Sequence, residues 1–180
     1  MSHPDFVGTT VTVGQNSTTE KQLREGTFKT ILQRGQDVSG RVEDDNASPV
    51  SEATVWAGRK YTRDRKQTTS DAGGHFFFHS VQSGEGLFAV MAKSHGADAK
   101  TVNVHADMSE IIFQLKAGSV IRAHVQDESG QPVADARVGL EGGYGDPSYD
   151  AYEFTANTDS NGDFSWDGAP NQTMTFYIFH

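Results

Sequence analysis

The chain has 180 residues, of which 15 are basic and 24 acidic, and its formal net charge of −9 argues against a sequence-independent nucleic-acid binder, which needs a basic face. It contains no cysteine, which excludes disulfide bonds and thiolate metal sites, and no run of about 20 apolar residues that could span a membrane. With 19 glycines and 35% apolar residues, the composition favours short strands joined by many turns over a large α/β core.

The sequence repeats itself. Residues 35–55 (GQDVSGRVEDDNASPVSEATV) align with residues 118–138 (GSVIRAHVQDESGQPVADARV), and residues 70–76 (SDAGGHF) align with residues 158–164 (TDSNGDF). The offset is 83 residues in the first pair and 88 in the second, so the second copy carries five extra residues in one loop. Periodicity of this size predicts an array of similar structural modules.

The two ends of the chain are out of phase with this repeat. Residues 2–13 (SHPDFVGTTVTV) resemble residues 94–104 (SHGADAKTVNV), which lie at the end of the complete copy. We therefore expect three parts: the C-terminal tail of a preceding repeat at residues 1–34, a complete module at residues 35–117, and a truncated second repeat at residues 118–180. We call residues 35–117 the first segment and residues 118–180 the second segment. Within the tail, only Thr18 to Glu25 has weakly helical spacing, and Gly26 would end that helix.

From residue 36 onward, apolar residues alternate with polar ones, which predicts half-buried strands rather than helices. The inward-facing residues of the first strand are Val38, Gly40 and Val42, and those of its counterpart are Ile121, Ala123 and Val125. Further strands are expected at residues 54–57, 75–79, 87–93, 101–104, 111–115 and 137–141. About seven strands per module is the number typical of a β-sandwich.

Turn motifs separate these strands. A polar stretch with Pro and Asp follows the first strand of each copy, at residues 44–53 and 127–136. Each copy then has an Asp-x-x-Gly-x-Phe motif, in which the Asp accepts backbone N–H groups, the Gly adopts a positive φ and the Phe begins a strand. The residues are Asp71, Gly74 and Phe76 in the first copy and Asp159, Gly162 and Phe164 in the second.

These residues carry a resemblance to a known family. The order GRVED (40–44), PVSEA (49–53) and S/T-D-x-x-G-x-F (70–76 and 158–164) resembles the carboxypeptidase regulatory-like domain. The resemblance implies an all-β fold of tandem transthyretin-like (prealbumin-like) β-sandwich modules, similar to B-type repeats of collagen adhesins and to starch-binding-like folds. One departure is Ala123, which stands where the first copy has Gly40.

The same resemblance implies a non-catalytic accessory unit, of the kind found in tandem in extracytoplasmic bacterial proteins. The sequence has no HExxH, Gly-x-Ser-x-Gly, P-loop or dinucleotide-binding motif. We therefore expect a non-enzymatic spacer, adhesion or protein-interaction region, without a cofactor, in a larger secreted or cell-envelope protein. The N-terminal residues themselves show no signal-peptide pattern.

The longer loop of the second copy, residues 142–154 (GGYGDPSYDAYEF), is the candidate ligand site. Its aromatic and acidic residues are Tyr144, Tyr149 and Tyr152 beside Asp146 and Asp150. Flexible aromatic loops of this kind stack on sugar rings or anchor a protein partner. The alternative function is therefore a carbohydrate-binding module. Packing against a neighbouring module is the other interpretation of this loop.

A weak calcium candidate lies at Asp159, Asn161 and Asp163, because Ca²⁺ prefers several oxygen ligands at alternating positions. The acidic residue that would end such a loop is missing, so a plain hairpin turn is the other interpretation. No other metal site is expected. Along one strand face, His75 and His79 would lie about 13 Å apart at about 3.3 Å per residue, too far to share an ion.

Two loops of unlike charge occupy corresponding positions in the two copies. The basic residues are Arg59, Lys60, Arg63, Arg65 and Lys66, and the acidic residues are Asp146, Asp150 and Glu153. They are either two solvated loops or a contact between successive modules through opposite charges. The phase of the chain also predicts head-to-tail self-association, in which the tail of one chain completes the truncated module of another by strand addition.

Overall fold

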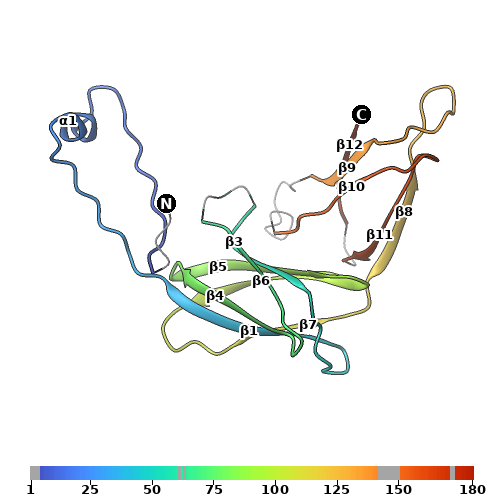
Figure 1. Ribbon diagram of the computed structural model, residues 1–180, viewed down its shortest axis with the longest axis horizontal. Coiled ribbons are helices and arrows are strands. Elements are labelled where there is room, and N and C mark those ends of the chain that lie inside the picture. The colour runs from blue at the N-terminus through green and yellow to red at the C-terminus, as the bar shows by residue number, and fades with distance from the viewer. Residues whose placement is uncertain (1–4, 61, 63, 142–150, 171–172) are drawn as a thin grey trace.

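The computed structural model describes residues 5–60, 62, 64–141, 151–170 and 173–180. In this part of the chain the fold is almost entirely β, as the sequence predicts, with one short helix (Figure 1). The elements are α1 (Thr18–Arg24), β1 (Gln36–Asp44), β2 (Thr54–Ala57), β3 (Lys66–Thr69), β4 (His75–Val81), β5 (Gly84–Ala92), β6 (His95–Val104), β7 (Ile111–Leu115), β8 (Ser119–His124), β9 (Arg137–Leu140), β10 (Thr155–Asn157), β11 (Asp163–Ala169) and β12 (Phe176–Phe179).

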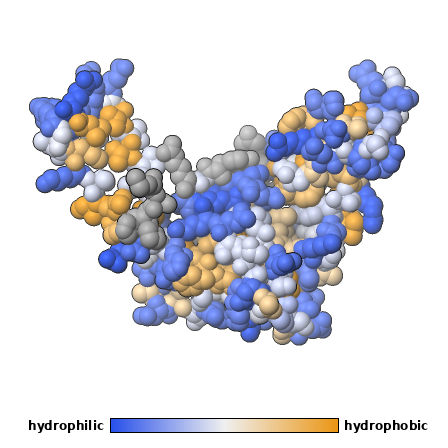
Figure 2. Space-filling view, in the orientation of Figure 1, coloured by the Kyte–Doolittle hydropathy of each residue, from blue (hydrophilic) through white to orange (hydrophobic). Residues whose placement is uncertain are grey.

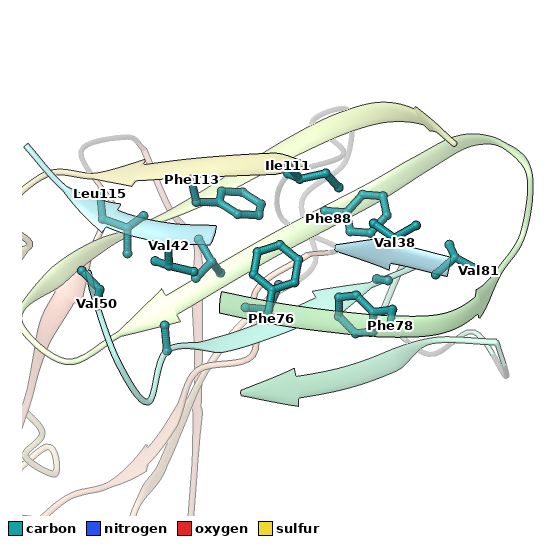
Figure 3. Packing of buried hydrophobic residues seen from close by; sticks show 14 of the residues in the cluster. Val38, Val42, Val50, Phe76, Phe78, Val81, Phe88, Ile111, Phe113 and Leu115 are labelled. Carbon is teal, nitrogen blue, oxygen red and sulfur yellow. The ribbon is translucent and has the colours of Figure 1, made fainter. Parts of the chain in front are cut away.

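The first segment is a β-sandwich of seven strands. One sheet has the order β4-β1-β7, in which β4 is antiparallel and β7 parallel to β1. The other has the order β3-β2-β5-β6. The inward side chains of both sheets form one apolar core, which Figure 3 shows, and its largest fully buried residues include Phe88, Phe113 and Leu115. Val38 and Val42 of β1 are fully buried in this core, which confirms the predicted inward face.

The second segment reproduces the strand pairings of the first. Phe164 pairs with Ala123 as Phe76 pairs with Gly40, which matches β11-β8 to β4-β1. The sheet β10-β9-β12 has the order of β3-β2-β5, and its residue pairs correspond at the same offsets. The aligned sequences therefore adopt the same local pairing.

The turns of the two segments also share their hydrogen bonds. The Asp71 carboxylate accepts the backbone N–H groups of Gly73 and His75, at 2.9 and 2.8 Å. The Asp159 carboxylate accepts those of Asn161 and Asp163, at 2.8 and 3.0 Å. These bonds close each turn locally. The turns are also tied to the first strand of each segment, because the Gly74 and Gly162 carbonyls accept the N–H groups of Val42 and Val125.

In each segment, the hydroxyl of the residue before the Asp of the motif hydrogen-bonds to the polar stretch that follows the first strand. Ser70 donates its Oγ hydrogen to the Val50 carbonyl at 2.8 Å and accepts the Ala53 N–H at 2.9 Å. Thr158 makes the same two bonds, to the Val133 carbonyl and from the Ala136 N–H. The Ser/Thr that precedes Asp in the motif is therefore a structural residue, because its hydroxyl satisfies two buried backbone groups.

The two segments differ in how far their cores are covered. Val90 of β5 is fully buried, whereas its counterpart Ile178 of β12 is 48% exposed. Ile121 is half-buried, as predicted, but Ala123 is exposed, which corrects the expectation that both face a core. The reason is that the described residues include no counterparts of β6 and β7 beside β12 and β8. The division of the chain into complete and truncated modules stays a prediction.

The N-terminal arm, residues 5–34, extends away from the sheets (Figure 1). Its helix α1 begins after Ser17, whose Oγ accepts the Glu20 N–H, and the chain leaves it at Gly26 with φ +67°, as predicted. Residues 10–13, which resemble the strand residues 101–104 in sequence, form no strand. The two limbs of the arm are joined at their base, by the bridge between Phe6 and Arg34.

Two glycines of the second segment have nearly the same φ but different surroundings. Substituting each of them therefore compares the effect of backbone strain with that of steric contact. Gly130 has φ +78° and open space around it, whereas a Cβ at Gly162, with φ +76°, would lie 2.4 Å from the Val125 carbonyl oxygen. We expect Gly130→Ala to lower the free energy of unfolding by about 1 kcal/mol and Gly162→Ala by at least about 3 kcal/mol. Urea unfolding followed by circular dichroism measures both, and equal losses would contradict the steric explanation.

Candidate functional site

Outside the sandwich core, a second cluster of buried apolar residues lies between the two segments. On β2, Val55 points into the sandwich core while its neighbour Trp56 points to the opposite face of the sheet, and both are buried. The second segment covers this opposite face. The resulting apolar cluster, here called the junction cluster, comprises Trp56, Leu87, Ala89, Ala97, Leu140, Ala151, Tyr152, Trp166 and Ala169.

Arg65 crosses the junction. Its Nη1 lies 2.9 Å from Oε1 of Glu153, and its Nη2 donates to the Ala151 carbonyl at 2.9 Å. The guanidinium carbon lies 5.1 Å from the centre of the Trp56 ring, in cation–π geometry. Only 10% of the Arg65 side chain is exposed. Of the two interpretations of the charged loops, Arg65 and Glu153 fit the contact through opposite charges. Arg63, Asp146 and Asp150 lie outside the described residues.

Glycines bring the two backbones together beside this cluster. Gly118 donates its N–H to the Ser94 carbonyl at 2.9 Å, and Gly96 donates to the Lys116 carbonyl at 2.9 Å. A Cβ at Gly118 would lie 2.4 Å from the Asp167 carbonyl oxygen, and one at Gly168 would lie 2.9 Å from the His95 carbonyl oxygen. Side chains cannot fit there, so the absence of a Cβ permits the close approach of β6 and β11.

Part of the candidate ligand loop lies in this junction. Tyr152 is 2% exposed and belongs to the junction cluster, so its ring contributes to the packing between the segments. Next to it, Phe154 stacks on Trp166 with ring centres 4.3 Å apart. The other predicted ligand residues, Tyr144, Asp146, Tyr149 and Asp150, lie outside the described residues. Ligand binding by them stays a prediction.

The calcium candidate lies in the turn between β10 and β11, which belong to different sheets. The Asp159 carboxylate is engaged by its two backbone donors, and Asp163 Oδ1 lies 2.9 Å from Nδ1 of His124. In the described part of the chain, no three His, Asp or Glu side chains gather in a way that could hold a metal ion. The hydrogen bonds from the backbone of Asp163 and Asn161 lower the pKa of the Asp159 carboxyl.

Comparison with protein families agrees with the turn motifs and the sandwich. The sequence model of the carboxypeptidase regulatory-like domain family matches residues 37–116. This part of the chain is similar to carboxypeptidase regulatory-like domains. Its bounds enclose all seven strands of the first sandwich except the first residue of β1.

Comparison with solved structures finds larger proteins at low similarity, and two of them serve as examples. A streptococcal ancillary pilin matches at 10% identity and a TM-score of 0.34, over 83% of this chain and 55% of that one. The Bacillus anthracis TIE protein matches at 10% identity and a TM-score of 0.34, over 79% of this chain and 30% of that one. The chain thus spans about half the length of the first and less of the second. No curated protein matches it in sequence. None of the helices described is long and apolar enough to cross a membrane.

The junction cluster was not predicted, although the sequence of the first segment contains a signal for it. In TVWA (54–57) and LFAVMA (87–92), apolar residues occupy successive positions rather than alternate ones. Such runs indicate strands that are buried on both faces. On this interpretation, Trp56 and Ala89 must be buried by a part of the molecule outside the sandwich.

Substitutions at Arg65 will separate its packing from its charge. We expect Arg65→Ala to lower the free energy of unfolding by about 2 kcal/mol, because the Ala151 carbonyl loses its donor and Trp56 loses its cover. Arg65→Lys should recover little, since an ammonium group cannot make both bonds and the stacking contact. Glu153→Ala should cost under about 1 kcal/mol, because Glu153 is 46% exposed.

Urea unfolding followed by tryptophan fluorescence is the appropriate measurement. Both tryptophans of the protein, Trp56 and Trp166, lie in the junction cluster and report on it directly. A loss for Glu153→Ala as large as that for Arg65→Ala would mean that the ion pair, rather than the packed guanidinium, holds the junction.

The lowered pKa of Asp159 predicts a loss of stability in acid. Because this pKa is lower in the folded than in the unfolded state, the stabilisation is complete above the unfolded value, about pH 4, and declines as the pH falls through the folded value. Asp159→Asn retains an acceptor oxygen but does not titrate. Urea unfolding at a series of pH values below about 4 should therefore show a shallower decline for the variant, and identical slopes would contradict this role.

Proposed function

We propose that this chain is a non-enzymatic structural region, a spacer or adhesion segment that holds successive β units at a fixed angle within a larger extracytoplasmic protein. The observation that supports this proposal is the junction between the segments. The similarity of residues 37–116 to the carboxypeptidase regulatory-like domain family supports an accessory role. The extracytoplasmic location rests on the resemblance to that family.

The junction has the features of a rigid connection. In the link, the Lys116 carbonyl accepts the N–H of Gly96 in β6, and Gly118 donates its N–H to the Ser94 carbonyl in the turn between β5 and β6. The outer face of the β2-β5-β6 sheet is buried under β9, β11 and the residues around Tyr152. A flexible linker would leave such apolar side chains exposed to water, at a cost of about 25 cal/mol per Å². The chain therefore gains stability from keeping one orientation between its segments.

A variant that separates the backbones tests this role. Gly118→Ala places a methyl group against the backbone of Asp167, Gly168 and His95. We expect the segments to move apart, with a broader distribution of distances between spin labels at Ser39→Cys and Ser165→Cys, two exposed positions in a protein without cysteine. Pulsed electron paramagnetic resonance measures this distribution.

Gly8→Ala is the matched control, because nothing lies within 4 Å of a Cβ at that position. A broad distribution in the unmodified chain, or no change in Gly118→Ala, would count against a fixed angle. Hydrolytic activity that copurifies with the chain and disappears on a single substitution would overturn the non-enzymatic assignment.

A further inference from the structure

The base of the N-terminal arm has the same backbone hydrogen bonding as the isolated bridge that joins the start of β6 to the residues after β7. In the arm, Val7 donates its N–H to the Gln33 carbonyl at 2.9 Å, next to the bridge between Phe6 and Arg34. Between β6 and β7, Gly96 donates to the Lys116 carbonyl at 2.9 Å, next to the bridge between His95 and Ala117. The limbs of the arm therefore correspond to β6 and β7, with Phe6, rather than the predicted His3, in the place of His95.

Beyond this base, the limbs of the arm expose apolar side chains. The exposed fractions are 41% for Val11, 45% for Val13, 89% for Ile31 and 42% for Leu32. Apolar residues are visible on the arm in Figure 2. Within the described chain these residues belong to no sheet. At the offsets of the base, the counterparts of Val13 and Leu32 are Val102, which packs against the sandwich core, and Leu115, which is 1% exposed in the closed sandwich.

The second segment presents the matching edges. In the first segment, β7 lies parallel to β1 and β6 lies antiparallel to β5. The corresponding edges of β8 and β12 carry no strand in the described part of the chain. Beside them, Val120 and Ile178 are each 48% exposed and Phe179 is 57% exposed. Open sheet edges with exposed apolar residues favour pairing with another strand.

We propose that the N-terminal arm of one copy of this chain docks on the second segment of another copy and completes its sandwich. Residues 28–32 lie parallel to β8, and residues 7–13 lie antiparallel to β12. In Figure 1 the arm and the second segment are at opposite ends of the first sandwich, so the acceptor is a second molecule. The contact is head to tail and therefore builds a ring or a filament. It does not depend on the proposed spacer role.

The first segment supplies the register of this contact. Val42 pairs with Phe113, and Asp44 pairs with Leu115, on β1 and β7. At the offset of 83 residues that the repeat and the arm's base share, Val125 pairs with Thr30 and Asp127 pairs with Leu32. In β7, Leu115 points into the core whereas Gln114 is exposed. Leu32 therefore points into the completed core, and Ile31, its neighbour, points outward.

Ala123 weakens the contact at one point. A Cβ at Gly40, its counterpart, would lie 2.4 Å from the Ile111 carbonyl oxygen of β7. The methyl group of Ala123 therefore keeps the docked strand at a greater distance there. Removing it should tighten the association, so Ala123→Gly is a variant with an expected gain.

The register gives a test with a matched control, by light scattering coupled to size exclusion over a range of concentrations. We expect the full chain to associate, Leu32→Asp to weaken association at least about tenfold, and Ile31→Asp to change it little. Ala123→Gly should shift association to lower concentrations. Non-specific hydrophobic association would be weakened more by Ile31→Asp than by Leu32→Asp, because Ile31 is the more exposed side chain. That order, or a monomer at all concentrations, would overturn the proposal.

Disulfide trapping tests the same contact without relying on destabilising variants. Because the protein has no cysteine, Thr30→Cys and Val125→Cys each carry a single thiol. Mixing the two under mild oxidation should yield the mixed dimer, since directly paired residues lie within disulfide range. Ile31→Cys mixed with Val125→Cys is the control and should yield much less. Equal yields in the two mixtures would refute the register, and no mixed dimer would refute the docking.

Discussion

The arrangement of the whole molecule depends on one sheet that is apolar on both faces. In β2 and β5, Val55 and Val90 bury their side chains in the sandwich, while Trp56 and Ala89 bury theirs on the other side. Burying both faces of a sheet requires three layers. The β4-β1-β7 sheet is the first cover and the second segment is the second. The orientation of the second segment is thus fixed by the need to cover Trp56, and Arg65 closes the rim of that contact.

The two segments share the hydrogen bonds that form within a turn or between neighbouring parts of the chain. The Asp-x-x-Gly-x-Phe turn and the preceding Ser or Thr form the same bonds in both segments, although the segments are covered to different extents. Each of these bonds joins groups that are close in sequence or lie on adjacent strands. The turns therefore persist when the distant strands that bury Val38 and Val90 have no counterpart around Ile121 and Ile178. This is why a short motif identifies the family without specifying a binding activity.

The sequence predicted the elements whose signals are local. Alternation identified β1, and the glycine at position 26 identified the end of α1. It did not identify β3 and β10, whose sequences KQTT and TAN have no apolar alternation. These strands exist because β2 and β9 offer them hydrogen-bonding partners, which is a tertiary effect. The burial of Tyr152 agrees with the other interpretation of its loop, packing against a neighbouring module. The sequence did not show which surface Tyr152 covers, because its partner Trp56 lies 96 residues earlier in the chain.

The five extra residues of the second copy distinguish the two segments at the surface where they meet. They lengthen the loop that ends in Ala151, Tyr152 and Glu153, which lie against Trp56 and Arg65. The corresponding loop of the first copy is shorter and contains Arg65, whose guanidinium donates hydrogen bonds across the junction. The two sides of this contact are therefore made by loops of different length, although the strand pairings beside them are the same.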